Sequence, residues 1–131
     1  MDQEIKIMLV EDNPEDAAFT QRILKLNRLN KDLVLATCGR EAMEALERGH
    51  KNGNLPDLIL LDINLPDISG IDLLTRIKEE LPFCKIPVVI LTGSNEDQDI
   101  QKSYDLGASS YLVKPISNEA LMLVVEKLFH S

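Results

Sequence analysis

The chain has 131 residues, of which 44% are hydrophobic, and a formal net charge of −8. This length suits one domain with a single core, and the acidic balance disfavours direct binding to nucleic acid or to an anionic membrane. No apolar run approaches the roughly 20 residues of a membrane helix, and the N-terminus lacks the basic and apolar parts of a signal peptide, so a cytoplasmic location is expected.

The first part of the chain predicts two strands that alternate with two helices. Residues 5–10 form a short apolar run that is typical of a buried strand. An Asn-Pro pair follows and predicts the start of a helix over 14–26, because asparagine is a good N-cap and proline suits the first helical position. Residues 33–37 predict a second strand. A second helix is predicted over 40–48, closed by Gly49.

The same alternation continues through the middle of the chain. Residues 58–61 are apolar throughout, as expected for a strand that is covered on both faces. A helix capped by Ser69 is predicted to run to about residue 81. Residues 88–91 predict a fourth strand, and a helix over 97–106 follows it.

Residues 110–113 predict a fifth strand, and Ser117 is predicted to cap a final helix. Strict alternation of strands and helices implies right-handed crossovers and a parallel sheet with helices on both faces. We therefore predict an α/β, doubly wound, flavodoxin-like fold with five strands in the order 2-1-3-4-5, which makes residues 1–131 a single domain. Cys38 and Cys84 are too few for a disulfide framework or a zinc site, so free and mostly buried thiols are expected.

Reactive polar residues stand where the predicted strands end. Glu11 and Asp12 follow the first strand, Asp62 the third, Thr92 the fourth and Lys114 the fifth. The carboxyl ends of parallel strands line a common crevice. Clustered carboxylates can hold a hard cation such as Mg²⁺, and a carboxylate can also accept a phosphoryl group as a nucleophile. A hydroxyl and an ammonium group can bind phosphoryl oxygens, so the pattern predicts a metal-dependent phosphoryl site.

Each of these residues also has an ordinary structural interpretation. A single acid such as Asp62 at a strand end is usually a solvated loop residue. The Glu11-Asp12 pair suits the cap of the next helix, Thr92 can satisfy backbone groups, and Lys114 can be a surface charge. The coincidence of compatible chemistry at four strand ends on one edge favours the functional interpretation.

With these motifs in place, the chain resembles the receiver domain of two-component response regulators over essentially its whole length. The matching motifs are Val10-Glu11-Asp12-Asn13, Leu61-Asp62-Ile63-Asn64-Leu65-Pro66 with Gly70, Leu91-Thr92-Gly93, Gly107-Ala108 and Lys114-Pro115. The acidic entry with its proline and the loop at 50–56 further resemble the small regulators that pair with bacterial phytochromes.

The resemblance implies that Asp62 accepts a phosphoryl group from a sensor histidine kinase or a phosphotransfer protein. It implies that Asp12, Asp62 and the backbone carbonyl of Asn64 bind Mg²⁺ or Mn²⁺, with Glu11 acting mainly through water. The protein would then be a stand-alone regulator without an output domain. It would not be an enzyme beyond catalysing its own phosphorylation and dephosphorylation.

The resemblance also assigns the switch. Thr92 and Lys114 would hold the phosphoryl group, Tyr111 falls at the aromatic switch position, and the bond before Pro115 would be cis, which a proline makes possible. A face made by the fourth helix, the fifth strand and the fifth helix would form homodimers or bind targets. Leu123 is expected to be exposed on that face.

Three other classes are weaker matches. An aspartate-nucleophile phosphatase of the haloacid dehalogenase type needs a general acid two residues after the nucleophile, where this chain has Asn64. A flavodoxin-like electron carrier needs a hydroxyl- and glycine-rich phosphate loop, but the acidic residues after the first strand would repel phosphate. An adaptor that works without phosphorylation would not require the intact set of five site residues.

Overall fold

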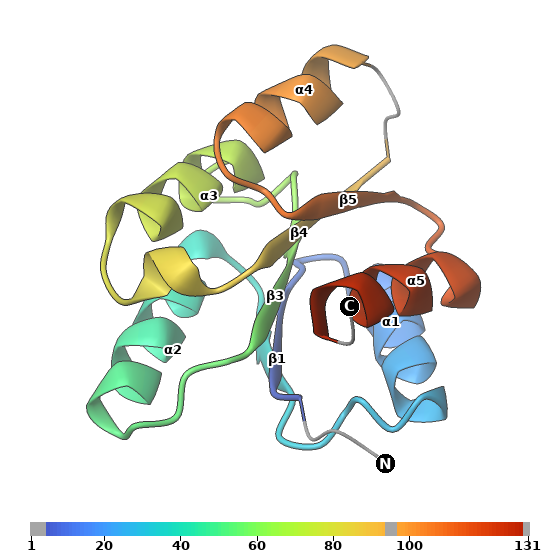
Figure 1. Ribbon diagram of the computed structural model, residues 1–131, viewed down its shortest axis with the longest axis horizontal. Helices are drawn as coiled ribbons and strands as arrows, with labels where there is room; N and C mark the ends of the chain where they lie inside the picture. Colours follow the sequence, from blue (N-terminus) through green and yellow to red (C-terminus); the bar gives the residue numbers. More distant parts are fainter. Residues whose placement is uncertain (1–4, 94–96, 130–131) are drawn as a thin grey trace.

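The computed structural model describes residues 5–93 and 97–129, and its centre is a parallel five-stranded sheet (Figure 1). The strands are hydrogen-bonded in the order β2-β1-β3-β4-β5, which confirms the predicted doubly wound topology. The strands are β1 (Ile7–Val10), β2 (Val34–Ala36), β3 (Leu58–Asp62), β4 (Val88–Thr92) and β5 (Ser110–Val113).

Helices cover both faces of the sheet. Helices α1 and α5 lie on one side, and α2 and α3 lie on the other (Figure 1). The helices are α1 (Pro14–Leu26), α2 (Gly39–Lys51), α3 (Gly70–Glu79), α4 (Asp97–Asp105) and α5 (Asn118–Phe129), with a short 3₁₀ helix at Phe83–Lys85. Within the described ranges, no helix is both long and apolar enough to cross a membrane.

The sheet divides the hydrophobic core into two clusters. Alternate residues of each strand point to opposite faces, so Leu9 and Leu60 pack in the cluster with α1 and α5. Met8 and Leu61 pack in the cluster with α2 and α3. Central strands buried on both sides explain why their sequences are apolar throughout.

The register of the sheet aligns the ends of the strands. Val10 is the partner of Leu61, so Glu11 and Asp62 leave neighbouring strands at the same level. Asp62 is in turn the partner of Leu91, which brings Thr92 one residue beyond it on β4. The predicted switch point therefore lies between β1 and β3, where the chain crosses to opposite sides of the sheet.

The predicted caps are present at three helix starts. The side chains of Asn13, Ser69 and Ser117 each accept a hydrogen bond from a backbone N–H in the first turn of the next helix, at 2.9, 3.1 and 3.0 Å. These bonds satisfy N–H groups that have no partner inside the helix. Helix α4 ends before Gly107, which has a positive φ of 106°.

The predicted end of α3, the predicted start of β1 and the predicted burial of the two cysteines are wrong. Helix α3 ends at Glu79 rather than 81, because the residue before Pro82 disfavours helical backbone, and Leu81 is 75% exposed. Strand β1 starts at Ile7, two residues later than predicted. Both cysteines are partly exposed rather than mostly buried: Cys38 stands at the start of α2 and Cys84 in the 3₁₀ helix.

Gly49 does not close α2, as the sequence predicted, because the helix continues to Lys51. The turn is made instead by Gly53, with a φ of 66°. The loop that follows the turn packs against Gly49, and the N–H of Asn54 donates to the Gly49 carbonyl at 2.7 Å. Glycine is needed here because a Cβ at this position would stand 2.7 Å from the Asn54 carbonyl oxygen.

We expect Gly49→Ala to destabilise the protein by about 1–3 kcal/mol, the usual cost of overpacking. This cost exceeds the gain of at most about 1 kcal/mol from the better helix propensity of alanine. Glu47→Ala, at an exposed position of the same helix, should change stability by less than about 0.5 kcal/mol. Urea unfolding of both variants is the measurement, and a Gly49→Ala protein at least as stable as the wild type would contradict the packing argument.

Candidate functional site

Three carboxylates gather at the carboxyl edge of the sheet. Glu11, Asp12 and Asp62 each offer an oxygen, and these atoms lie within 4.8 Å of one another. Glu11 and Asp62 are buried, whereas Asp12 is exposed. The N–H of Glu11 donates to the carbonyl of Ala36 at 2.9 Å, so β1 still pairs with its neighbour where the acid begins. Clustered carboxylate oxygens with one exposed member fit a hard divalent cation that keeps some of its water.

Lys114 brings an ammonium group into this acid cluster. Its Nζ lies 2.8 Å from Glu11 Oε1 and 3.2 Å from Asp62 Oδ1. The backbone N–H of Lys114 donates to the carbonyl of Thr92 at 2.7 Å, which aligns the end of β5 with β4. The predicted residues Glu11, Asp62 and Lys114 therefore share one site.

Asp16 completes the site, and the sequence analysis did not identify it. Its Oδ2 accepts a hydrogen bond from Lys114 Nζ at 3.0 Å. The sequence signal was an acid in the first turn of α1, which suits the helix dipole on its own. The Asn13 side chain also accepts a hydrogen bond from the Asp16 N–H at 3.0 Å, so the turn that carries this acid is held by the cap.

The electrostatics of the site follow from burial and from like charges. Burial, together with a hydrogen bond and charge repulsion from Asp62, raises the pKa of Glu11 to about 7, against the opposing effect of Lys114. Burial by itself would lower the pKa of Lys114. Its hydrogen bonds to Glu11 and Asp16 and the charge of Asp62 outweigh burial, so the pKa of Lys114 is raised.

The raised pKa of Glu11 predicts a pH-dependent stability in the absence of metal. Folding favours the neutral carboxyl, so this stabilisation is complete below the ordinary pKa of 4.5 and is lost as the pH rises through about 7. The shift corresponds to roughly 3 kcal/mol. We expect Glu11→Gln, which mimics the neutral form, to remove most of this loss between pH 5 and pH 8. Urea unfolding in a chelator measures it, and equal pH dependence of wild type and variant would contradict the assignment.

The loop between β3 and α3, residues 63–69, follows Asp62. Asn64 is exposed, and its N–H lies 3.4 Å from Asp62 Oδ1. The loop closes through a hydrogen bond of 2.7 Å from the N–H of Gly70 to the Ile63 carbonyl. A Cβ at position 70 would overlap the Asp62 carbonyl and the Ile63 backbone. Gly70 therefore allows α3 to begin directly against the end of β3.

The predicted switch residues lie on the neighbouring strands β4 and β5. Thr92 is buried at the end of β4. Tyr111 is partly buried on β5, and its ring contacts Tyr104 of α4 edge-on, with ring centroids 6.0 Å apart and planes at 84°. The Lys114-Pro115 peptide bond is cis, as the resemblance implied.

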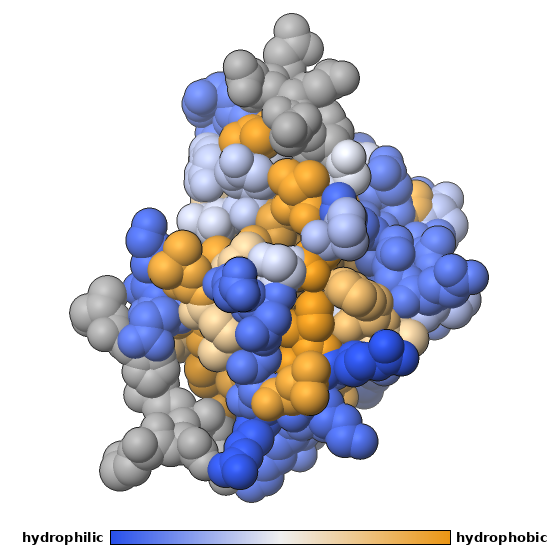
Figure 2. All heavy atoms as spheres, turned by 90° about the vertical axis from the view of Figure 1, so that its right-hand side faces the viewer, coloured by the Kyte–Doolittle hydropathy of each residue, from blue (hydrophilic) through white to orange (hydrophobic). Residues whose placement is uncertain are grey.

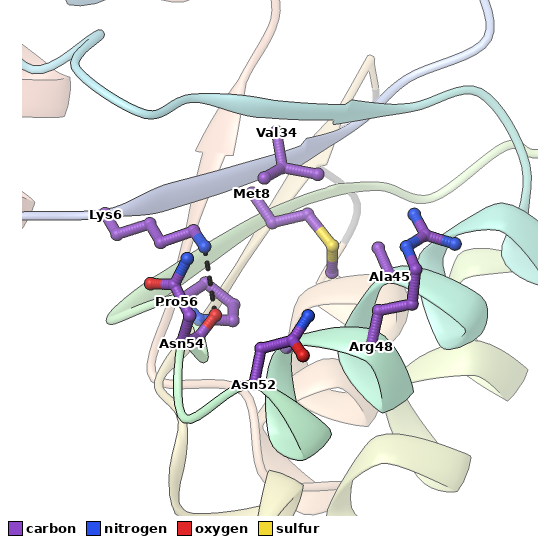
Figure 3. Close-up of a pocket in the computed structure, with 9 residues that line it drawn as sticks. Lys6, Met8, Val34, Ala45, Arg48, Asn52, Asn54 and Pro56 are labelled. Carbon is purple, nitrogen blue, oxygen red and sulfur yellow. Dashed lines mark hydrogen bonds between the residues drawn. The ribbon is translucent and has the colours of Figure 1, made fainter.

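A hollow lies at the amino-terminal edge of the sheet, far from the acid cluster along the strands, between the start of β1 and the end of α2 (Figure 3). Lys6 points toward this hollow, but its ammonium group is held by the Asn54 carbonyl at 2.9 Å. Arg48 and Asn52 line the helix side, and Met8 lies at the sheet side (Figure 3). None of the described residues that line it is acidic, so this hollow does not share the chemistry of the acid cluster.

The family model of the response regulator receiver domain matches residues 7–126. The chain belongs to this family. Response regulator Rcp1 of Synechocystis sp. is 36% identical over 122 residues, which cover 92% of the chain and 83% of Rcp1. This receiver domain is also similar to the structure of the phosphorylated cyanobacterial phytochrome response regulator RcpA, with a TM-score of 0.81, 36% identity, and coverage of 98% and 96% of the two chains.

The Mn²⁺-bound form of Rcp1 is similar as well, with a TM-score of 0.77, 35% identity, and coverage of 95% and 93%. These matches confirm the resemblance inferred from the motifs. The receiver domain is thus a response regulator of two-component signalling, a class that carries its phosphoryl group on an aspartate. Its acid cluster has the oxygen ligands that a divalent cofactor such as Mg²⁺ or Mn²⁺ requires.

Proposed function

We propose that Asp62 is the phosphoryl acceptor of this receiver domain, and that the donor is a phosphohistidine of a sensor kinase or a phosphotransfer protein. The observation that carries the proposal is the position of Asp62, between two further carboxylates and the Lys114 ammonium group. Asp12, Asp62 and the Asn64 carbonyl would bind Mg²⁺ or Mn²⁺, and Glu11 would act through water. The bound cation would neutralise charge on the phosphoryl oxygens.

The side chains then have separate roles. An Asp62 carboxylate oxygen attacks phosphorus, the bond from phosphorus to the donor nitrogen breaks, and an acyl phosphate forms. The Lys114 ammonium group and the Thr92 hydroxyl bind the new phosphoryl oxygens. Water later attacks the same phosphorus, the bond from phosphorus to the Asp62 oxygen breaks, and inorganic phosphate leaves as the carboxylate is regenerated. In this proposal the protein catalyses only its own phosphorylation and dephosphorylation.

Acetyl phosphate is a direct test, since it supplies a phosphoryl group without a kinase. With Mg²⁺, intact mass spectrometry should show one added phosphoryl group per chain, and a chelator should prevent the addition. No mass gain at any Mg²⁺ concentration would overturn the proposed function. Transfer to water without a phosphorylated intermediate would favour a phosphatase instead.

A hollow beside the site supports docking of a phosphoryl donor. It is lined by Phe19 of α1, by Ile116 and by Lys114, next to the acid cluster. Phe19 is 42% exposed although it is a large apolar residue. On this side of the molecule, apolar side chains form a band between hydrophilic flanks (Figure 2). A partner that seats an apolar helix here would bring its phosphohistidine within reach of Asp62.

The output would run through Thr92 and Tyr111. A phosphoryl group on Asp62 adds strong acceptor oxygens that draw the Thr92 hydroxyl inward. Space vacated by Thr92 lets the Tyr111 ring turn inward, away from its edge-on contact with Tyr104. This movement would change the face formed by α4, β5 and α5. In this proposal residues 1–131 act as one cytoplasmic receiver unit that does not bind nucleic acid or membranes directly.

We further propose that this face forms a homodimer. Tyr104, Val113 and Leu123 are 43%, 36% and 63% exposed, so each of the three elements presents an apolar side chain. We expect Leu123→Asp to weaken self-association by about tenfold or more, because it places a charge in an apolar contact. Sedimentation velocity with and without beryllofluoride measures this. The control is Leu26→Asp, because Leu26 is also an exposed leucine but lies on α1, away from the proposed dimer face. A wild type that stays monomeric under all conditions would contradict the dimer.

A further inference from the structure

Helix α2 is capped by a residue of the loop between β3 and α3. The Asp67 carboxylate accepts hydrogen bonds from the N–H groups of Gly39 and Arg40, at 2.8 and 2.9 Å. These are the first two residues of α2, whose N–H groups have no partner within the helix. The N-cap residue itself, Cys38, forms no side-chain cap bond in the described structure. The missing cap is therefore supplied from 28 positions further along the chain.

The residue next to Asp67 interlocks with the same helix terminus. The side chain of Ile68 occupies the space in which a Cβ at Gly39 would stand. At the end of the loop, Gly70 packs directly against the Asp62 carbonyl. The loop is therefore fixed by Asp62 at one end, by Gly70 at the other, and by α2 in between. Asn64 lies within this fixed loop.

The hydrogen bonds from Gly39 and Arg40 to Asp67, which we call the Asp67 clamp, are charge-assisted. Hydrogen bonds from the backbone N–H groups of Gly39 and Arg40 lower the pKa of Asp67, which shows that these bonds favour its ionised form. The positive end of the helix dipole favours the same charge. Hydrogen bonds to an ionised acceptor are stronger than neutral ones.

We propose that Asp67 is a positioning residue for the metal and phosphoryl site: it holds the loop between β3 and α3 on the N-terminus of α2, so that the Asn64 carbonyl faces the acid cluster. This inference rests on the proposed function, in which that carbonyl is a ligand. Residues that orient ligands in this way typically change metal affinity by 10–100-fold when replaced.

Glu41 provides a matched control at the same helix terminus. Its carboxylate accepts hydrogen bonds from the N–H and the hydroxyl of Thr37, at 2.7 and 2.8 Å, and these bonds lower its pKa as well. Glu41 and Thr37 both belong to the segment around the start of α2, and neither contacts the loop at 63–69 through these bonds. Glu41→Ala therefore removes a carboxylate that ties Thr37 to the first turn of α2, and it leaves the hydrogen bonds of Asp67 in place.

The experiment compares Mg²⁺ affinity, by calorimetric titration, in wild type, Asp67→Ala, Asp67→Asn and Glu41→Ala. We expect about tenfold weaker Mg²⁺ binding for Asp67→Ala, an intermediate loss for Asp67→Asn, which keeps one acceptor oxygen, and a change of less than about twofold for Glu41→Ala. Thermal unfolding should show a lower midpoint for both alanine variants. The amide NMR signal of Asn64 should move in the Asp67 variants and not in Glu41→Ala.

The outcomes separate the clamp from the proposed function. If the wild type binds Mg²⁺ and gains a phosphoryl group, but Asp67→Ala and Glu41→Ala lose Mg²⁺ affinity equally, Asp67 has only a structural role and the inference is overturned. The same conclusion holds if Asp67→Ala binds Mg²⁺ as the wild type does. If the wild type itself neither binds Mg²⁺ nor gains a phosphoryl group, the proposed function fails first.

Discussion

Lys114→Met should destabilise the metal-free protein by about 3–5 kcal/mol at pH 8, the usual cost of removing one partner from a buried ion pair. Methionine keeps most of the side-chain volume but removes the charge. Glu11 and Asp62, whose side chains are 0% and 5% exposed, would then repel each other without a counter-ion. The loss should shrink below pH 7, because Glu11 becomes neutral there.

Urea unfolding in a chelator at pH 6 and pH 8 measures this effect. Lys127→Met, on the exposed side of α5, is the control and should change stability by less than about 0.5 kcal/mol. The double variant Glu11→Gln, Lys114→Met should recover much of the stability at pH 8. A Lys114→Met protein as stable as the wild type at pH 8 would show that the ammonium group does not hold the carboxylates together.

Asp62→Asn should abolish phosphorylation by acetyl phosphate in the presence of Mg²⁺. Asparagine keeps the shape and the acceptor oxygen but lacks the nucleophile, and losing a nucleophile costs on the order of 10⁴-fold or more in rate. The fold should persist. Metal-free stability at pH 8 should not fall, because one of the crowded buried carboxylates becomes neutral.

Intact mass spectrometry over time measures the phosphoryl gain. Asp57→Asn is the matched control: Asp57 directly precedes the same strand at its opposite end, where its carboxylate accepts a hydrogen bond from the Lys6 N–H at 2.9 Å. It should be phosphorylated, on Asp62, at the wild-type rate. If Asp62→Asn still gained a phosphoryl group, the acceptor would be another residue, and the proposed role of Asp62 would be lost.

The position of the site was predictable because it depends on strand order and register. Glu11 and Lys114 directly follow β1 and β5, and Asp62 is the last residue of β3. Parallel strands bring such positions to one edge. The role of Asp16 was not predictable in this way. Whether a first-turn acid faces solvent or the sheet depends on the rotation of α1 about its own axis. The local sequence around Asn13 and Pro14 predicts where the helix starts but does not indicate that rotation.

Contacts between segments that are distant along the chain could not be predicted from the sequence either. Gly49 was assigned to a helix end because glycine is common there, but its real constraint is the Asn54 carbonyl that packs on it. Asp67 lies in a loop without any periodicity, so no pattern indicates that it caps a helix that begins 28 positions earlier. Such contacts override local propensity, and the sequence alone carries no direct signal of them.

The edge-on contact between Tyr104 and Tyr111 gives this protein a built-in optical reporter. The chain contains no tryptophan and only two tyrosines, and both belong to this one contact between α4 and β5. The tyrosine fluorescence and the tyrosine bands of the near-ultraviolet circular dichroism spectrum therefore come from a single place in the molecule. A rotation of either ring would be visible without any label, so the conformational response can be timed directly by stopped-flow methods in the unmodified chain.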